Sequence, residues 1–465
     1  MSDSFEKMTA KKSAKSMIIS LFFLLLIGAA AIAFYLYFER EKPQISFHGD
    51  ISTIGLTKEV KFTVTDSRSG ISLVEIVLFQ GSKSAKVYGK EFSRKGFFEH
   101  NGPKQLKETV TLKSGALGFK DGAAELKVTV RDFSFWNLMA GNETVMTYPV
   151  TMDTHPPKIS ILHSTRYVRP GGSGMVVYKI NDAVEKHGLT VNGHFNPGFP
   201  VADEEDDRYI AYFGLNYDTE KIEKAVVSAT DIGGNTGNAA FGMILKKKPL
   251  KKDTINISDN FLNLKIPEFA QEYPQLTGSL VEQFVYVNSK IREENFQSIV
   301  QATSTPSSKR LWHGKFGRMA GSRMAGFAEH RTYYYSNAEI DQQVHLGVDL
   351  ASTKRAEIKA ANRGNVVFAE YLGIYGNTVI LDHGQGIFSL YSHMSQIGVA
   401  AGELVDKGAV IGLSGKTGMA GGDHLHFSIL INGIFVSPLE WWDVQWLQLN
   451  IEDILFGTKS KYRNF

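Results

Sequence analysis

Apolar residues are concentrated in one uninterrupted run near the start of the chain. Residues 17–38 hold 22 positions without a charged side chain, and they follow a polar, lysine-containing stretch, residues 1–16. A run of this length can cross a bilayer as a helix, and lysines before it favour an N-terminus in the cytoplasm. The pattern predicts a cytoplasmic tail over residues 1–16 and a transmembrane helix over residues 17–38. A cleaved signal peptide is the competing interpretation, since Ala31-Ile32-Ala33 is typical of a cleavage site, but the apolar run continues beyond it.

From residue 43 the pattern changes to an alternation of apolar and polar positions. Residues 60–65 and 126–131 alternate in this way, which is typical of strands with one buried face. Turn residues such as Asp66-Ser67-Arg68-Ser69-Gly70 separate the alternating stretches. We therefore predict an immunoglobulin-like β-sandwich over residues 43–153.

A partial internal repeat indicates a second sandwich. Val130-Arg131-Asp132, followed by Trp136-Asn137, is echoed about 99 residues later by Ala229-Thr230-Asp231, followed by Gly234-Asn235. Two prolines at positions 156 and 157 lie between the copies and suit a linker, because proline cannot donate to a strand ladder. We predict a second immunoglobulin-like module over residues 157–247. Both modules resemble the immunoglobulin-like repeats of bacterial surface proteins.

A helical pattern follows the second module. Phe284, Val287 and Ile291 fall on one face of a helix, within a partly helical linker that we predict over residues 253–310. Their apolar face covers either a flank of the next domain or the mouth of a groove in it. In the second case the glycine-containing stretch 319–327 would act as a lid over that groove.

Short strands interrupted by glycine fill the last third of the chain, for example residues 364–369 and 377–382. They predict a mostly antiparallel β domain over residues 311–445, followed by a C-terminal tail over residues 446–465. The expected fold class is mainly β: an N-terminal transmembrane helix, two β-sandwich modules, a partly helical linker and a C-terminal antiparallel domain.

Composition narrows the function classes. Net charge is +3 and the chain of 465 residues is 43% apolar, an ordinary value for a globular protein. Because no basic patch with interleaved aromatic residues is present, the sequence does not favour a nucleic-acid partner. The chain has no cysteine, so a metal such as zinc would have to be held by histidine and carboxylate.

The spacing of histidines near the C-terminus points to metal chemistry. His424 and His426 alternate in a predicted strand, so both imidazoles meet the same pocket. A catalytic zinc site uses three protein ligands and a water. His345 and Asp349, four residues apart, can supply two ligands, and one histidine of the His-x-His pair can supply the third. The other histidine of the pair and His393 are then available for proton transfer.

These residues resemble the lysostaphin/LytM-type zinc metallopeptidases, peptidoglycan endopeptidases. The resemblance covers residues 311–445 and implies that His345, Asp349 and His426 bind Zn²⁺, while His393 and His424 lie beside the water. This chain departs from the family in having Ser428 where glutamate is common, and in a diffuse entry segment. The matching motifs are His345-x-x-x-Asp349, Tyr391-x-His393-Met394 and His424-Leu425-His426-Phe427, with Gly364-Asn365-Val366-Val367, Tyr375-Gly376-Asn377, Asp382-His383-Gly384, Gly412–Gly418 and Ser437-Pro438 between and after them.

The resemblance implies a zinc metalloendopeptidase that cuts peptide bonds in peptidoglycan cross-links. His393 is our choice for the general base, and His424 would stabilise the oxyanion or orient the water, although their roles can be exchanged. A non-catalytic wall-binding or hydrolase-activating envelope protein is the alternative, and retention of all three ligand residues favours the enzyme. The expected partners are peptidoglycan, the membrane through one helix, and a regulatory envelope protein. The expected location is the inner (cytoplasmic) membrane, single-pass, with the large domain periplasmic or extracellular.

Overall fold

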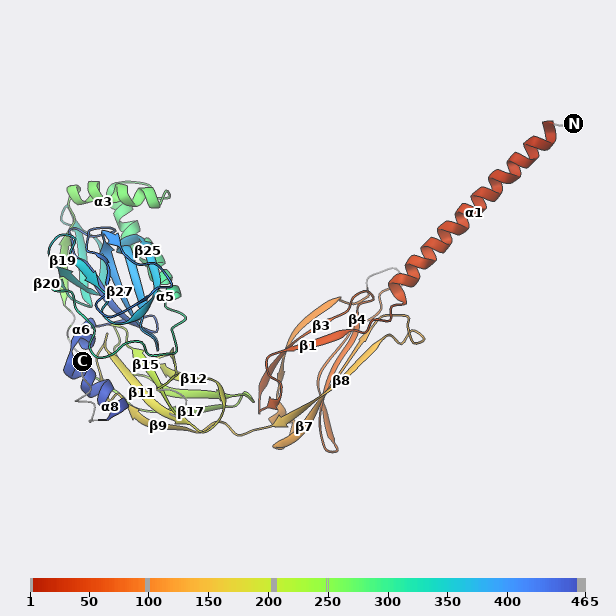
Figure 1. The fold of residues 1–465 in the computed structure, drawn as a ribbon, viewed down its shortest axis with the longest axis horizontal. Helices are drawn as coiled ribbons and strands as arrows, with labels where there is room; N and C mark the ends of the chain where they lie inside the picture. The colour runs from red at the N-terminus through yellow and green to blue at the C-terminus, as the bar shows by residue number, and fades with distance from the viewer. Residues whose placement is uncertain (1–2, 97–100, 202–206, 248, 250, 458–465) are drawn as a thin grey trace. The chain divides into compact units, whose positions relative to one another are not determined.

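The chain folds into two compact units in the computed structural model, which describes residues 3–96, 101–201, 207–247, 249 and 251–457 (Figure 1). The first unit contains the chain up to Pro157, together with Ala183–Glu185 and Thr230–Thr236. The second unit contains Lys158–Asp182, Lys186–Ala229 and the chain from Gly237 onward. Most elements in both units are strands, so the expected class, mainly β, is confirmed.

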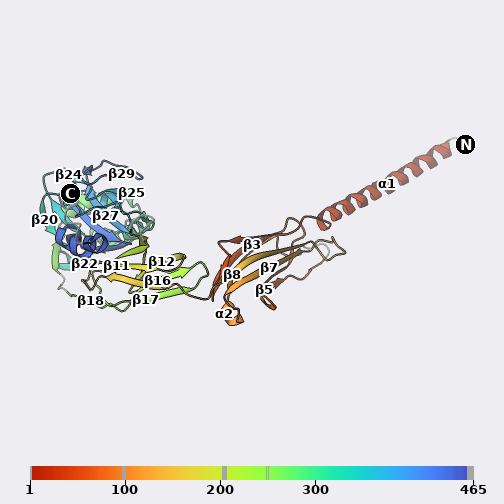
Figure 2. The ribbon, with the colours of Figure 1, turned by 60° about the horizontal axis from the view of Figure 1, so that its bottom comes forward.

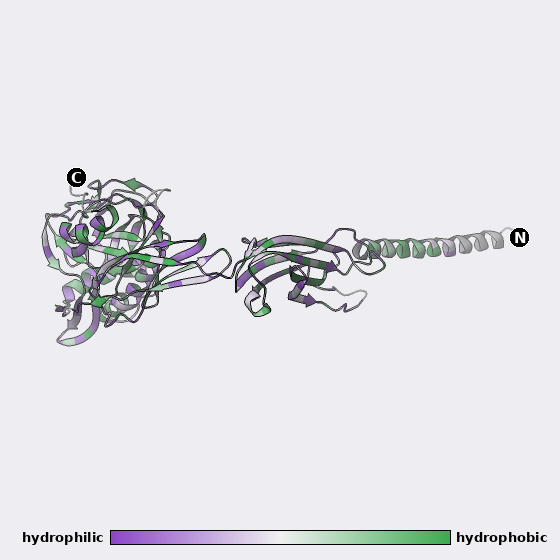
Figure 3. Ribbon diagram, turned by 90° about the horizontal axis from the view of Figure 1, so that it is seen from below, coloured by the Kyte–Doolittle hydropathy of each residue, from purple (hydrophilic) through white to green (hydrophobic). Residues whose placement is uncertain are grey.

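The first element is the predicted apolar helix. Helix α1 (Asp3–Tyr37) contains a stretch, Lys15–Tyr35, with a mean hydropathy of 2.8 and no part buried against the protein. Figure 3 shows the hydrophobic colour along this stretch. The helix is long and apolar enough to cross a membrane, and it begins inside the region predicted as a tail.

The predicted alternating stretches form a β-sandwich after this helix. Strand β3 alternates as the sequence predicts, with Val60, Phe62 and Val64 buried in the core. Leu126, Val128 and Val130 face the same core from the other sheet. One sheet has the order β1 (Gln44–His48), β3 (Lys58–Thr65), β6 (Gln105–Leu112); the other has β2 (Thr53–Ile54), β8 (Glu143–Met152), β7 (Gly122–Asp132), β4 (Ile71–Gln80), β5 (Lys83–Glu91).

A second pair of four-stranded sheets follows (Figure 2). Strands β11 and β15 are buried on both faces: Val176 and Phe213 face the partner sheet, whereas Val177 and Tyr212 belong to the core of the C-terminal domain. The residues numbered 158–247 therefore share a hydrophobic core with the domain that follows them. One sheet has the order β14 (Phe199–Pro200), β15 (Arg208–Gly214), β11 (Ser173–Ile180), β9 (Ile159–Ser164); the other has β13 (His194–Pro197), β12 (Val184–Val191), β16 (Ala225–Asp231), β17 (Thr236–Ala240).

The linker is partly helical, as predicted, but it belongs to the C-terminal domain. Strand β19 (Lys252–Asn256) pairs in parallel with β21 (Glu329–Tyr335). After it come α3 (Asp259–Glu272), capped by Ser258, and α4 (Leu280–Tyr286), which begins with a capping box of Ser279 and Glu282. A π-helical turn (Val287–Ile291) then leads into α5 (Arg292–Ala302). Val287, Ile291 and Ile299 are buried against the main sheet of the domain.

That main sheet carries the predicted site residues. Its pairings are all antiparallel, in agreement with the sequence prediction. Helices α6 (Pro438–Trp442), α7 (Val444–Leu447) and α8 (Asp453–Phe456) close the domain, with Leu447 and Leu455 in its core; residues 458–465 of the predicted tail lie outside the described residues. The strand order is β20 (Ser322–Ala325), β23 (Val348–Ala351), β31 (Leu425–Ile431), β27 (Ile387–Met394), β26 (Gly376–Asp382), β25 (Gly364–Leu372), β29 (Leu404–Val405), with β32 (Ile434–Val436) beside β31.

Candidate metal centre

Three strands from two sheets bring the predicted ligand residues together. His345 ends β22 (Ala338–His345), Asp349 lies on β23 and His426 on β31. Asp349 and His426 are direct cross-strand partners in the antiparallel ladder. Their Cβ atoms therefore leave the same face of the sheet.

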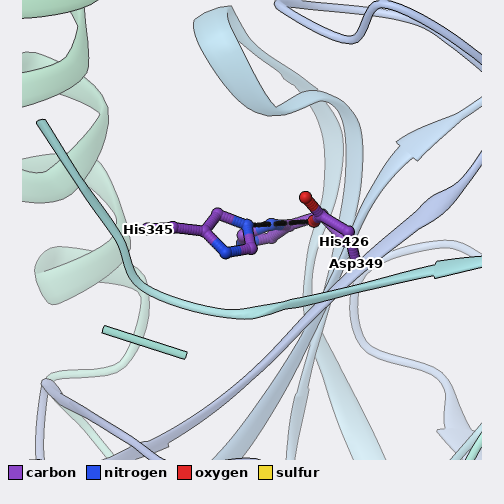
Figure 4. Close-up of side chains that lie close together, drawn as sticks. All are labelled: His345, Asp349 and His426. Carbon is purple, nitrogen blue, oxygen red and sulfur yellow. Dashed lines mark hydrogen bonds and ion pairs between the residues drawn. The ribbon is translucent and has the colours of Figure 1, made fainter. Parts of the chain in front are cut away.

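The donor atoms of these three side chains converge on one point (Figure 4). His345 Nε2 lies 3.0 Å from Asp349 Oδ1 and 2.9 Å from His426 Nδ1, and His426 Nδ1 lies 2.9 Å from Asp349 Oδ1. The side chains are buried, with 5–8% of each residue exposed. Two imidazole nitrogens and one carboxylate oxygen in this arrangement fit the three-ligand site of a catalytic zinc. We call these residues the His-Asp-His cluster.

Hydrogen bonds behind the cluster fix which ring nitrogen faces its centre. His345 Nδ1 donates to Gly326 O at 2.8 Å, because a carbonyl can only accept. Ser428 Oγ donates to Leu346 O at 2.8 Å and therefore accepts from His426 Nε2 at 3.2 Å. His345 Nε2 and His426 Nδ1 are left with lone pairs for a metal. Ser428, the departure from the family pattern, thus orients a histidine of the cluster.

His393 and His424 lie beside the cluster. His393 is on β27 with a left-handed backbone, φ 63°, a conformation that is costly for a side-chain-bearing residue and concentrates at functional sites. Its Nδ1 donates to Thr417 O at 2.9 Å. Its ring centroid is 4.8 Å from that of His424, and His424 Nε2 is 3.7 Å from Asp349 Oδ1. The structure therefore gathers all five predicted residues in one place.

Burial and neighbouring side chains shift the pKa values of Asp349 and His393. Burial would raise the pKa of Asp349, but His345 and His426 outweigh it and hold that pKa well below its ordinary value. Burial, reinforced by His424 and His426, holds the pKa of His393 well below its ordinary value. Asp349 is therefore ionised and His393 neutral near pH 7.

Arg331 is a site residue that sequence reasoning missed. It lies on β21, and its Nη2 donates to Asp349 Oδ2 at 3.3 Å, which leaves Oδ1 directed at the two histidines. Alternation along β21 places Arg331 on the same face as Tyr333, and both line the pocket above the cluster. The pairing of β21 with β22 brings it there, in a hairpin whose strands are joined by Ser336 and Asn337, both with positive φ. A two-residue turn of this kind between two strands is a local signal that could have found Arg331.

The pocket above the cluster has a volume of about 400 Å³, and residues 253–302, which we call the helical segment, supply one of its walls. Ile257, Phe261 and Phe284 line that wall. Val287 and Ile291 instead pack on the sheet. The three apolar residues that the sequence grouped on one face are thus divided between pocket and flank. The stretch 319–327 contains β20, which pairs with β23 at the edge of the sheet.

Comparisons with known proteins agree with this geometry. Residues 343–438 match the family described as Peptidase family M23. The DD-carboxypeptidase/endopeptidase Mpg of Neisseria meningitidis is 38% identical over 97 residues, which are 21% of this chain and 22% of that protein. The peptidoglycan DD-endopeptidase ShyA of Vibrio cholerae is 36% identical over 96 residues, 21% of this chain and 22% of that protein.

A relative with a different description matches the same region. The murein hydrolase activator EnvC of Escherichia coli is 35% identical over 95 residues, 20% of this chain and 23% of that protein. The match spans about a fifth of the length of each of these curated relatives. Similarity in this region is thus shared by proteins described as endopeptidases and by one described as an activator.

Proposed function

Because the C-terminal part of this chain is a domain of peptidase family M23, we propose that the protein is a zinc-dependent endopeptidase that cuts peptide bonds in peptidoglycan cross-links. The observation that carries this proposal is the convergence of His345 Nε2, Asp349 Oδ1 and His426 Nδ1 within 3.0 Å of one another. Peptidoglycan as substrate rests on the descriptions of the relatives. The proposed role is remodelling of the cell wall.

The His-Asp-His cluster would hold the zinc through those three atoms. When bound there, zinc supplies Lewis-acid polarisation of the scissile carbonyl and a water that ionises near neutral pH. The carbonyl of Gly326 and the hydroxyl of Ser428 keep the two imidazoles in the required tautomers. Arg331 keeps the carboxylate of Asp349 turned toward the same point.

His393 is the proposed general base. Its Nδ1–H is committed to Thr417 O, so in the neutral ring the lone pair is on Nε2. Its lowered pKa favours that neutral form. His424 donates through Nδ1 to Gly422 O, so its Nε2 lies on the Asp349 side. We assign to His424 the orientation of the water through its Nε2 lone pair, or, where Nε2 also carries a proton, the stabilisation of negative charge on the carbonyl oxygen.

The N-terminal helix is the proposed membrane anchor. Its apolar stretch has the length and hydropathy of a single span. The lysines before it favour a cytoplasmic N-terminus, which would place the sandwiches and the peptidase domain on the side of the membrane where peptidoglycan lies. A protease added to spheroplasts would then digest the large domain, whereas full protection with an intact membrane would reverse the proposed orientation.

A non-catalytic role as an activator of another wall hydrolase is the second candidate. It is favoured by the similarity to EnvC, and it would make the pocket a docking site for an envelope protein. The two candidates differ in whether the purified protein alone cleaves peptide bonds in peptidoglycan cross-links.

The deciding experiment is digestion of purified peptidoglycan by the full chain in detergent micelles, with and without added zinc. Mass spectrometry of the products should show cross-linked dimers converted to monomers by the gain of water. No conversion of dimers by the zinc-loaded protein, with stimulation of a second hydrolase, would establish the activator role. The full chain is required because residues 311–465 alone would expose Ile380, Phe388 and Leu390, which the helical segment covers.

A further inference from the structure

Three acidic side chains are buried together in the first sandwich. Glu39 lies just after helix α1, Asp66 follows β3 and Asp132 ends β7. Only 2%, 7% and 2% of these residues are exposed, respectively. Each offers a carboxylate oxygen within 4.8 Å of those of the other two. We call these residues the carboxylate cluster.

Protein donors hold two of the carboxylates in place. Glu39 Oε1 accepts from Ser69 N at 3.1 Å and from Ser69 Oγ at 2.6 Å. Asp132 Oδ1 accepts from Asn142 N at 2.7 Å, and Asp132 Oδ2 accepts from Asn142 Nδ2 at 2.8 Å. The positions of these carboxylates are therefore set by the fold.

Asp66, the third member of the cluster, uses only one of its two carboxylate oxygens in hydrogen bonds within the described part of the chain. Its Oδ2 accepts from Gly70 N at 2.6 Å and from Arg68 N at 3.2 Å. Its Oδ1 is buried and has no hydrogen-bond partner within the described part of the chain. A buried carboxylate oxygen without a partner is costly and calls for an explanation by a bound water or ion.

The charges in the cluster are also unbalanced. Burial, with Glu39 and Asp132 adding to it, raises the pKa of Asp66 to about 6. Among the ion pairs of the described residues, the one that reaches the cluster is from Arg68 Nε to Glu39 Oε2 at 3.9 Å. Three buried negative charges facing one guanidinium leave an excess that a divalent cation would neutralise.

The second sandwich repeats part of this construction. Asp231, at the end of β16, accepts from Asn235 N and Asn235 Nδ2, both at 2.9 Å. Asn235 Nδ2 also donates to the carbonyl of Asp153, just as Asn142 Nδ2 donates to the carbonyl of Glu39. In both places an Asp–Asn pair at a strand end holds the backbone of an acidic residue. The Asp–Asn pair is therefore a recurring part of the fold.

We propose that Glu39, Asp66 and Asp132 bind one calcium ion. All three ligands offer only oxygen, which favours a hard cation and disfavours zinc or copper. Calcium takes oxygen ligands at about 2.3–2.6 Å, so oxygens on opposite sides of it are roughly 5 Å apart. Because the carboxylate oxygens of the cluster already lie within 4.8 Å of one another, only small side-chain movements are needed to place them all around one ion. Magnesium demands a tighter octahedron and keeps several waters.

Binding would fix the segment that follows the apolar helix. Glu39 is two residues beyond Tyr37, where α1 ends, whereas Asp66 and Asp132 belong to the body of the sandwich. One ion shared by the three would tie the helix exit to the sandwich. Calcium sites of extracellular modules have dissociation constants of about 10⁻⁴–10⁻³ M, so the site would be filled on the outer side of a membrane. This proposal does not depend on peptidase activity.

The first test is equilibrium dialysis of the zinc-loaded full chain, in detergent, against radioactive calcium with magnesium present as competitor. The wild type should bind at millimolar calcium, and Asp66→Asn should bind one equivalent fewer. Asp50→Asn is the matched control, since Asp50 is a carboxylate of the same sandwich that accepts a single backbone N–H, from Ser52. Its calcium binding should equal that of the wild type. No binding by the wild type, or equal binding by Asp66→Asn, would refute the proposal.

The second test separates ion binding from a purely structural role. Asparagine at position 66 can keep the bonds from Gly70 and Arg68 and can direct its amide N–H at the neighbouring carboxylates. Without calcium, Asp66→Asn should therefore unfold at a higher temperature than the wild type. Calcium should raise the wild-type transition by a few degrees and leave that of the variant unchanged. An equal rise in both proteins would place the calcium elsewhere, and a wild type that does not respond would also overturn the proposal.

Discussion

The His-Asp-His cluster and the carboxylate cluster follow one plan with different donor atoms. Each gathers three buried side chains, with one donor atom from each within 4.8 Å of the others. The first cluster offers two nitrogens and one oxygen, and the second offers oxygens alone. Imidazole with carboxylate suits zinc, whereas carboxylates alone suit calcium. The comparison shows that donor chemistry, rather than burial or spacing, distinguishes the two sites.

The largest expected effects come from removing one carboxylate from each cluster in turn and measuring which metal is lost. Asp349→Ala removes the only carboxylate of the His-Asp-His cluster, so the full chain should lose stoichiometric zinc and all measurable cleavage of peptidoglycan. The same variant should keep its calcium, measured by dialysis. Asp66→Asn should show the reverse, with zinc content and cleavage unchanged. Metal analysis of both purified variants checks this, and a full equivalent of zinc in Asp349→Ala would disprove the ligand assignment.

The next effect separates metal binding from proton transfer within the His-Asp-His site. His393→Ala should keep its zinc, because His393 is not one of the three converging residues. Turnover should fall by about 10²–10⁴, the usual contribution of a proton-transfer group. His313→Ala, which alters a histidine outside the pocket lining, serves as the control and should cleave normally. Near-normal cleavage by His393→Ala would remove that residue from the mechanism.

The two clusters also differ in what the sequence could reveal. His345 with Asp349, and His424 with His426, are close neighbours in the chain, so each pair can be recognised as a short local motif. Only the pairing of β23 with β31 was needed to join them. Glu39, Asp66 and Asp132 come from distant segments, and the partial repeat aligned Asn137 where the structure uses Asn142. Sites made of isolated residues depend on topology, which local patterns do not encode.

The fold was predictable to a similar extent. Alternation correctly indicated strands such as β3 and β7, because one face of each is buried and the other is largely exposed. Strand β11 does not alternate, since Val176 and Val177 face two different cores. A continuous apolar run of this kind indicates burial on both faces, but it does not say which domain supplies the second face. The assignment of the two sandwiches as immunoglobulin-like, and their boundaries, stay predictions.

A smaller effect is expected from the hydroxyl behind His426. Ser428→Ala removes the acceptor for His426 Nε2 and leaves the three converging donor atoms in place. Loss of such a supporting bond typically costs about 10–100-fold in metal affinity or activity. Competition with a chromogenic chelator would measure the zinc affinity, and Ser428→Thr, which keeps a hydroxyl, should restore most of it. Unchanged affinity in Ser428→Ala would mean that the ring of His426 is held by its packing alone.

The smallest expected change in rate concerns the wall of the pocket above the His-Asp-His cluster. Phe284 and Val287 lie one helical turn apart and are both fully buried, but only Phe284 lines the pocket. If the helical segment is a structural wall, Phe284→Ala should lower the free energy of unfolding by about 3–5 kcal/mol, without raising the rate of cleavage. If the segment instead obstructs the groove, the same variant should cleave at least tenfold faster.

Val287→Ala is the matched control, because it weakens the contact with the sheet and leaves the pocket lining unchanged. We expect the first outcome, since Val287, Ile291 and Ile299 attach the segment to the sheet as core residues. A rise in rate for Phe284→Ala alone would show that the wall restrains the enzyme, and a rise in both variants would indicate that loosening the whole segment opens the groove.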